Sequence, residues 1–333
     1  MNSRECVLAA LRREKPQWIP TFEWLVDLRV RQALCPGGDE LDFVEKAGWD
    51  AVVVYADDHP DTDGKAEYVD EWGLTVRRAT EEYPVVVGHP LKATRDLQSF
   101  TSPNPLEPWH FRSLRKAVER FGGEKAIIFR LRDSYSLPRY LVGMEQFMVL
   151  MVEEPAFVQK VVDMAVDYYA AMARHVSRMG VDVFWTSDDY CDQRGPVMGP
   201  QRWRQLCLPG LKRLLGEVKQ LEKPFIKHCD GNVNTIVGDL VEAGIDGIDP
   251  IDTSAGVDLA DIKARFGDRV AIKGGVPVTL LCEGSPQQVR RCVKECLDIA
   301  GPEGYILSST SDITASVKPE NYAAMLEVWR EYR

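Results

Sequence analysis

The sequence predicts an α/β protein, a single (βα)8 TIM barrel with an N-terminal helical extension. Short, nearly continuous apolar runs alternate with amphipathic helices, which is typical of a parallel sheet covered by helices. Eight such runs occur along the 333 residues, a length that suits one barrel with an extension. The chain has no glycine-rich fingerprint of a dinucleotide or phosphate site, which disfavours the alternative, an open doubly wound sheet. No linker or repeat divides residues 1–333, so we expect one domain.

The chain begins with a predicted helix, in which Asn2 is the N-cap and Glu5 completes a capping box. Two further amphipathic helices are predicted over 154–180 and over 285–301, the second with Ser285 as its N-cap. The predicted strands often begin after Gly or Pro and end in polar residues; they cover residues 18–24, 51–58, 125–133, 181–189, 224–232, 245–252, 270–277 and 305–311.

Composition excludes several classes of protein. The net charge is −10 and no basic run is present, so the chain lacks the basic stripe of a nucleic-acid-binding protein. No segment approaches the ~20 apolar residues of a transmembrane helix. The first residues lack the apolar region of a signal peptide, so we expect a cytoplasmic protein without membrane association. The eight cysteines are therefore expected to be thiols, and three of them fall in one short region: Cys191, Cys207 and Cys229.

Polar and aromatic residues gather where the predicted strands end. In a barrel, the carboxyl ends of the strands build the active site. Any single acid at such a position is typical of a cap, but the whole set predicts a functional pocket at one mouth. These residues are Asp57, Asp58, Asp133, Asp188, Asp189, His228, Cys229, Asp230, Asp249 and the stretch 308–312, together with the aromatic residues Trp24, Trp185 and Tyr190.

Seven segments, taken together, give the chain a recognisable family pattern. They are DEWGLTVRR (70–78), VGMEQFMVLMVEEPAFV (142–158), DDYCDQRGPVMGPQRWRQLCLPGLKRL (188–214), KHCDGNV (227–233), AGIDGIDPID (243–252), DLADIKARFGDRVAIKGGV (258–276) and KPENYAAMLE (318–327). With these segments the sequence resembles the uroporphyrinogen decarboxylase superfamily over nearly its whole length. The resemblance implies a (βα)8 barrel, in agreement with the strand count, and two possible chemistries.

The first chemistry is that of the decarboxylases, which hold a tetrapyrrole with many carboxylates through an arginine-rich segment of the form RQAGR. The corresponding residues here contain Arg29 and Arg31 but no RQAGR, and Glu23 and Asp27 have the opposite charge. An acid-rich porphyrinogen would therefore lose its charge-assisted anchors. A decarboxylase, a lyase that needs no metal, remains an alternative.

The second chemistry is that of zinc-dependent methyltransferases that exchange methyl groups with a corrinoid. Many of these carry His-x-Cys at the KHCDGN strand and a third cysteine near the last strand. Here Asp230 occupies the cysteine position, and the last strand, LSSTSD, has no cysteine. Enzymes that activate a thiol such as coenzyme M need soft thiolate ligands on zinc. A methylcobalamin:thiol methyltransferase is therefore disfavoured and remains a second alternative.

A third pattern matches better, that of the substrate methyltransferases of aryl-ether O-demethylases, which carry zinc on Glu-x14-Glu-x20-His. Asp192, Cys207 and His228 stand at those intervals, and all three are competent zinc ligands. Pro209 follows Cys207 closely, so we expect Cys207 to end a short helix above the barrel mouth. Because neighbours alternate along a strand, Cys229 should point away when His228 faces the pocket, and Asp230 should return to the inner side. Two roles are open to Asp230 there, to support a ligand from behind or to replace one of the three.

The resemblance thus implies a zinc-dependent methyltransferase with one zinc per chain, held by Asp192, Cys207 and His228. It moves a methyl group from an aryl methyl ether to the Co(I) corrinoid of a partner protein. Trp24, Trp185 and Tyr190 are candidate contacts for the aromatic ring, with Asp189 and Asp230 beside them. A third alternative is a non-catalytic barrel that binds a corrinoid or its carrier protein.

Overall fold

Seven parallel strands form the central sheet, in the order β1-β5-β6-β9-β10-β11-β12. The structure, a computed structural model, describes residues 1–78 and 84–333. All seven strands lie within the segments predicted for them, and almost every side chain in them is buried, as expected for a sheet covered on both faces. They are β1 (Ala51–Tyr55), β5 (Ala126–Leu131), β6 (Val183–Ser187), β9 (Phe225–His228), β10 (Gly247–Ile251), β11 (Ala271–Val276) and β12 (Tyr305–Ser309).

The eighth predicted strand, 18–24, closes the barrel but is not a regular strand. Thr21 forms an isolated parallel bridge with Leu307, and its carbonyl accepts the amide of Asp50, just before β1, at 2.9 Å. The segment therefore lies between β12 and β1. Pro20 has no N–H to donate to a ladder, which limits the pairing here to a single bridge.

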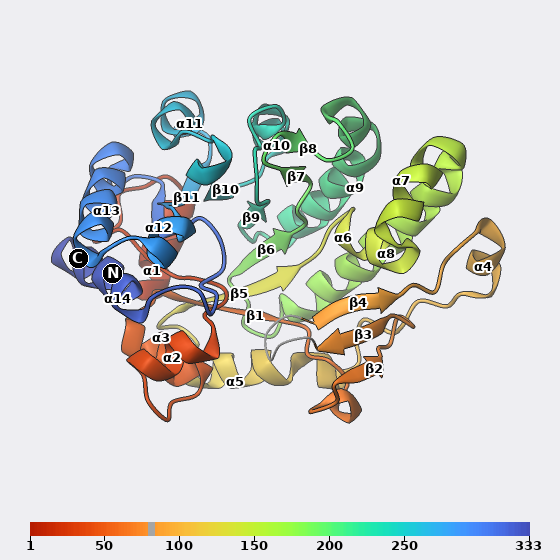
Figure 1. Cartoon of the computed structure of the whole chain (residues 1–333), viewed down its shortest axis with the longest axis horizontal. Coiled ribbons are helices and arrows are strands. Elements are labelled where there is room, and N and C mark those ends of the chain that lie inside the picture. Colours follow the sequence, from red (N-terminus) through yellow and green to blue (C-terminus); the bar gives the residue numbers. More distant parts are fainter. Residues whose placement is uncertain (79–83) are drawn as a thin grey trace.

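Helices surround the strands (Figure 1). The capping box at Asn2 and Glu5 is confirmed, and α1 packs against β1, β5 and β12 as the predicted N-terminal extension. The helices are α1 (Ser3–Leu11), α2 (Leu28–Leu34), α3 (Glu40–Ala47), α4 (Thr94–Ser99), α5 (Arg112–Phe121), α6 (Ser136–Val142), α7 (Met144–Glu153), α8 (Pro155–Val176), α9 (Pro200–Gln220), α10 (Val237–Ala243), α11 (Leu259–Phe266), α12 (Val278–Glu283), α13 (Pro286–Ala300) and α14 (Pro319–Glu331), with short 3-10 turns at Pro60–Thr62, Pro108–Phe111 and Thr253–Ala255.

Helix α9 corrects one expectation. Cys207 does not end a short helix, because α9 continues through Pro209 to Gln220. An interior proline costs a helix roughly 3 kcal/mol, and here packing outweighs that cost. Helix α9 lies along α8, and nine of its residues are buried, Cys207 and Leu208 among them.

A second, antiparallel sheet adds a feature that the sequence did not predict. It consists of β2 (Glu67–Val69), β3 (Thr75–Arg78) and β4 (Pro84–Gly88), and it lies beyond the end of β1 (Figure 1). Glu71, in the β2–β3 turn, anchors it to the barrel, since its Oε1 accepts a hydrogen bond from Tyr168 of α8 at 2.9 Å and lies 2.9 Å from Nε2 of His110. A short ladder of β7 (Cys191–Asp192) and β8 (Gly195–Pro196) follows β6.

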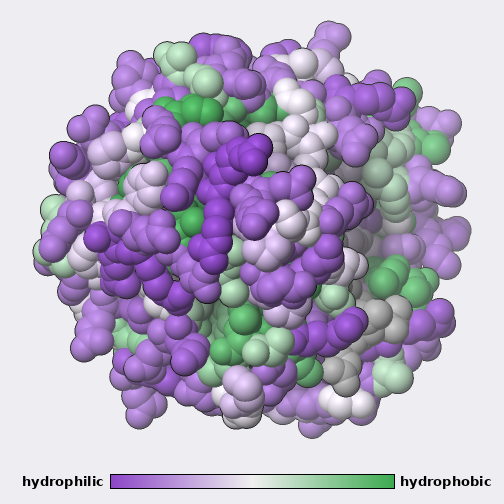
Figure 2. Space-filling model, turned by 60° about the vertical axis from the view of Figure 1, so that its left-hand side comes forward, coloured by the Kyte–Doolittle hydropathy of each residue, from purple (hydrophilic) through white to green (hydrophobic). Residues whose placement is uncertain are grey.

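The outer surface is mainly hydrophilic. On the face shown in Figure 2, hydrophobic residues appear in small separate groups between polar and charged ones. Within residues 1–78 and 84–333, no helix combines the length and the apolar character needed to cross a membrane.

Candidate active site

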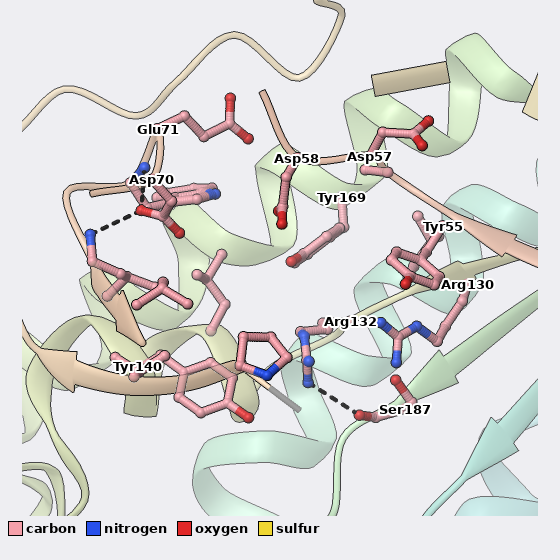
Figure 3. A pocket seen from close by; sticks show the side chains of 18 of the residues that line it. Tyr55, Asp57, Asp58, Asp70, Glu71, Arg130, Arg132, Tyr140, Tyr169 and Ser187 are labelled. Atoms are coloured by element: carbon pink, nitrogen blue, oxygen red, sulfur yellow. Dashed lines mark hydrogen bonds between the residues drawn. The ribbon is translucent and has the colours of Figure 1, made fainter. Parts of the chain in front are cut away.

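A cavity of about 480 Å³ opens at the carboxyl ends of the strands, between the barrel and the β2–β4 sheet. Figure 3 shows Asp57, Asp58, Asp70 and Glu71 opposite Arg130 and Arg132, and three more carboxylates line the cavity: Asp189, Asp230 and Asp312. Aromatic side chains line the cavity as well: Tyr169 lies between the two sides in Figure 3, and Trp24, Tyr55 and Tyr140 belong to the same lining. Burial raises the pKa of Asp70 to about 6, so this carboxyl takes up a proton at a higher pH than an ordinary aspartate. The cavity suits a small, flat, partly apolar molecule.

His228, the last residue of β9, faces this cavity from the barrel. Its Nδ1 lies 2.7 Å from Oδ2 of Asp249, its register partner on β10, and Asp249 in turn accepts Nζ of Lys273 at 2.8 Å. All three side chains are buried. This chain fixes the orientation of the imidazole and leaves Nε2 directed at two other carboxylates, since Oδ1 of Asp189 and Oδ1 of Asp230 each lie 3.5 Å from it.

The electrostatics of this group are unusual. Burial alone disfavours the charged imidazole, but the carboxylates of Asp230, Asp249 and Asp189 outweigh it and raise the pKa of His228 to about 9. Burial, partly offset by His228, raises the pKa of Asp230 to about 7. A buried imidazole is thus held beside two carboxylates whose side chains are 51% (Asp189) and 40% (Asp230) exposed, an arrangement that a cation in their midst would stabilise.

The geometry fits a metal ion. Within the described residues, Asp189, His228 and Asp230 are the only set of three or more His, Cys, Asp or Glu whose ligand atoms all lie within 4.8 Å of one another. Oδ1 of Asp230 is buried without a hydrogen-bond partner among those residues. An imidazole whose other nitrogen is bound to a carboxylate is the usual metal-ligand arrangement. Three nitrogen and oxygen donors facing a cavity leave a coordination position for substrate.

The structure does not bring Asp192, Cys207 and His228 together as one such group. Asp192 lies in β7, where its Oδ1 accepts the amides of Arg194 at 2.7 Å and Gly195 at 3.2 Å. Cys207 is fully buried in α9, with its Sγ 3.8 Å from Sδ of Met198. Burial, together with nearby carboxylates, raises the pKa of Cys207 well above its usual range, which keeps it a thiol.

The other residues predicted around the site divide into two sets. Trp24, Asp189 and Asp230 line the cavity together with His228. Trp185 is buried one layer below, 5.3 Å from the His228 ring and 6.2 Å from the Trp24 ring, so it supports both from behind. As the alternation along the strand predicted, Cys229 is buried away from the cavity, where its Sγ accepts the amide of Tyr190 at 3.3 Å.

Tyr190 belongs to a buried polar network under the site instead of to the cavity wall. Lys227 and Asp133 form an ion pair at 3.0 Å with both side chains fully buried. Tyr190 donates its hydroxyl to the same carboxylate, and Lys227 also donates to the carbonyl of Asp188 at 3.0 Å. The network joins β5, β6 and β9 directly below the metal-binding candidates.

Sequence reasoning missed Arg130 and Arg132, which form the basic side of the cavity. The signal was present in the run FRLRD, because residues two apart on a strand point to the same face. At the carboxyl end of a barrel strand, side chains such as those of Arg130 and Arg132 can reach the barrel mouth. The cavity-lining residues of the β2–β4 sheet, such as Trp72 and Val76, were also missed.

Comparisons with known proteins agree with this architecture. The family model for "Uroporphyrinogen decarboxylase (URO-D)" matches residues 41–332. The chain belongs to the uroporphyrinogen decarboxylase family. It is 23% identical over 257 residues to "Methylcobamide:CoM methyltransferase MtbA" of Methanosarcina mazei, covering 76% of this chain and 73% of that protein. It is 24% identical over 259 residues to "Uroporphyrinogen decarboxylase" of Nostoc punctiforme, covering 74% and 70%.

A solved structure of a "methyltransferase from Methanosarcina mazei" superposes with a TM-score of 0.82 at 20% identity, over 100% of this chain and 99% of that one. This likeness confirms the barrel fold. Relatives in the uroporphyrinogen decarboxylase family carry two different activities in their names, so membership alone leaves the reaction open and the site must decide it.

The arginines at the position of the family's RQAGR segment lie outside the cavity. Arg29 is exposed on α2, and Arg31 donates Nε to the carbonyl of Val26 at 3.0 Å. Glu23 is buried, with its carboxylate accepting both the amide and the hydroxyl of Ser309 at 2.8 and 2.9 Å. This segment therefore stabilises the barrel wall and presents no row of cations to a polycarboxylate.

The contact between Asp249 and His228 predicts a measurable effect on metal affinity. Asp249→Asn should weaken metal binding by about 10–100-fold, because an amide orients the imidazole less strongly and does not raise its basicity. Competition with a fluorescent chelator measures the affinity. The matched control is Asp252→Asn, which changes an acid that caps a neighbouring 3-10 turn without touching His228. Equal losses in the two variants would contradict the orienting role of Asp249.

Proposed function

We propose that this chain is a zinc-dependent methyltransferase that moves a methyl group from a methoxylated aromatic compound to the Co(I) corrinoid of a partner protein. The observation that carries the proposal is the Asp189–His228–Asp230 group at the wall of an aromatic cavity. Family membership and the similarity to methylcobamide methyltransferases support the corrinoid.

The donor set favours an oxygen substrate over a thiol. Carboxylate and imidazole are hard or borderline ligands, whereas metals that activate thiols are usually bound by thiolates. Among the described residues, no cysteine belongs to the candidate metal group. When bound, zinc supplies Lewis acidity at the ether oxygen and stabilises the phenolate that leaves.

The chain's own residues orient the substrate and control its surroundings. Asp249 and Lys273 hold His228 with Nε2 toward the cavity. Trp24, Tyr55 and Tyr169 offer ring faces and edges to an aromatic substrate. The β2–β4 sheet contributes Trp72 and Val76 to the opposite wall, which limits the access of water. The remaining opening is where a corrinoid protein would bring its cofactor.

The activity test uses zinc-loaded protein with free cob(I)alamin as the methyl acceptor. We expect absorbance changes that report methylcobalamin when a methoxylated aromatic is added, and none with the corresponding phenol. Methylcobalamin with a thiol such as coenzyme M, and uroporphyrinogen alone, serve as the two competing assays. Fast methylation of the thiol, or decarboxylation of the porphyrinogen, with no reaction of the aryl ether would overturn the proposal.

A further inference from the structure

Two half-buried arginines line the cavity, and among the described residues no carboxylate lies close enough to form an ion pair with either of them. Arg130 contacts two rings, with its guanidinium carbon 4.3 Å from the Trp24 ring centre and 4.5 Å from that of Tyr55. Arg132 lies 5.3 Å from the Tyr140 ring centre, and the one side-chain hydrogen bond that it forms with the described residues is a long one of 3.4 Å to the carbonyl of Ser187. Within residues 1–78 and 84–333, neither guanidinium forms an ion pair with an acid.

Because both side chains are partly buried, this arrangement is unfavourable in the absence of a ligand. Buried charges in proteins are normally paired, because desolvation penalises an isolated cation. Burial and the neighbouring charge of Arg132 lower the pKa of Arg130 to about 10, so both groups remain cationic near neutral pH and repel each other. Aromatic rings attract a guanidinium without accepting its N–H hydrogen bonds, and these N–H groups form the fork that matches a carboxylate.

We propose that Arg130 and Arg132 form an anion subsite that binds a carboxylate of the substrate. The proposal rests on the function proposed above, which supplies the methoxylated aromatic part of the substrate. It adds that the methyl donor is a methoxylated aromatic acid and not a neutral ether. Figure 3 shows the two side chains adjacent at one side of the cavity, with Tyr169 between them and the acidic side.

The position of the subsite fixes the orientation of the ligand. Ser187, which accepts from Arg132, is the register partner of His228 on the neighbouring strand. The carboxylate end of a substrate would thus lie one strand from the candidate metal group. The cavity's carboxylates repel an anion, both Asp58, Asp70 and Glu71 on the opposite side and Asp189, Asp230 and Asp312. Among the described lining residues the two arginines are therefore the favoured place for a carboxylate, and the reversed orientation is disfavoured.

The test is a binding measurement that needs neither metal nor turnover. Isothermal titration of metal-free protein with benzoate and with benzamide compares a carboxylate with a neutral molecule of nearly the same shape. We expect benzoate to bind at least about tenfold more tightly than benzamide. Arg132→Gln and Arg130→Lys should each weaken benzoate binding by about tenfold or more and leave benzamide binding unchanged. The matched control is Arg29→Gln, an exposed arginine outside the cavity, which should bind benzoate as the parent does.

Each result bears on the subsite independently of the reaction. Equal binding of benzoate and benzamide, or full benzoate binding in Arg132→Gln, would overturn it. Tighter binding of benzenesulfonate than of benzoate would overturn the carboxylate assignment. Since Arg130 is half-buried against two rings and its replacement can disturb folding, circular dichroism accompanies each titration. The Arg132→Gln result stands alone if Arg130→Lys unfolds. A chain that binds benzoate through these arginines yet transfers no methyl group would refute the proposed function and leave the subsite intact.

Discussion

His228→Ala is expected to lower methyl transfer by at least about a hundredfold and to release the bound metal. Replacing the residue that orients a metal-binding histidine typically lowers metal affinity by about 10–100-fold, so replacing the histidine itself should lower it further. The fold should survive, because Asp249 keeps its 2.8 Å ion pair with Lys273 when the imidazole is removed. Metal content by mass spectrometry, circular dichroism and the cob(I)alamin assay measure the three outcomes.

Two further variants separate the ligand sets. Asp189→Asn should also weaken zinc binding. Cys207→Ser should keep its full zinc content, because Cys207 is a buried thiol packed against Met198. If zinc is instead held by Asp192, Cys207 and His228, the serine variant loses metal at little cost in stability and Cys207→Glu recovers part of it. If Cys207 only packs, the glutamate variant is severely destabilised, because it buries a carboxylate without a partner.

Lys227→Met is expected to lower the free energy of unfolding by about 3–5 kcal/mol, the largest stability effect that we expect of a single substitution. Both side chains are fully buried, so the change leaves Asp133 as an uncompensated charge in the protein interior. Since domains are stable by only about 5–15 kcal/mol, much of the chain would unfold under mild denaturant. Urea denaturation followed by circular dichroism measures the loss.

The control for this variant is Lys212→Met, on the exposed side of α9, which should change stability by less than about 0.5 kcal/mol. Adding Asp133→Asn to Lys227→Met removes the uncompensated charge and should restore part of the lost stability. A loss below about 1 kcal/mol in Lys227→Met would show that the buried pair contributes little to the fold.

The barrel could be predicted from the sequence because its strands are buried on both faces. When runs such as AIIFRL and VFWTS alternate with helices, few arrangements other than a helix-covered parallel sheet can bury them. Prediction failed where tertiary packing overruled a local rule. Pro209 should break a helix, yet contacts along both sides of α9 carry the helix through it. The β2–β4 sheet was missed because its partner strands are short, and their pairing depends on the wall of the barrel beside them.

The candidate site was predicted in part. Alternation along β9 correctly placed His228 and Asp230 on the cavity and Cys229 behind them. Asp189 was expected near the substrate and lies beside His228 Nε2. Spacing alone suggested Asp192 and Cys207, but spacing along the chain does not determine which way a helical or turn residue points. Asp192 accepts the Arg194 amide within its own turn, and the Cys207 side chain packs against Met198. Their roles as zinc ligands remain predictions.

The most direct test of the account is X-ray absorption at the zinc edge of the protein reconstituted with one equivalent of zinc. A site made of Asp189, His228 and Asp230 predicts a first shell of nitrogen and oxygen only, at about 2.0–2.2 Å, with imidazole scattering and no sulfur. That spectrum should disappear in His228→Ala and persist in Cys207→Ser. A sulfur scatterer at about 2.3 Å, lost in Cys207→Ser, would contradict the assignment, as would protein that binds no zinc.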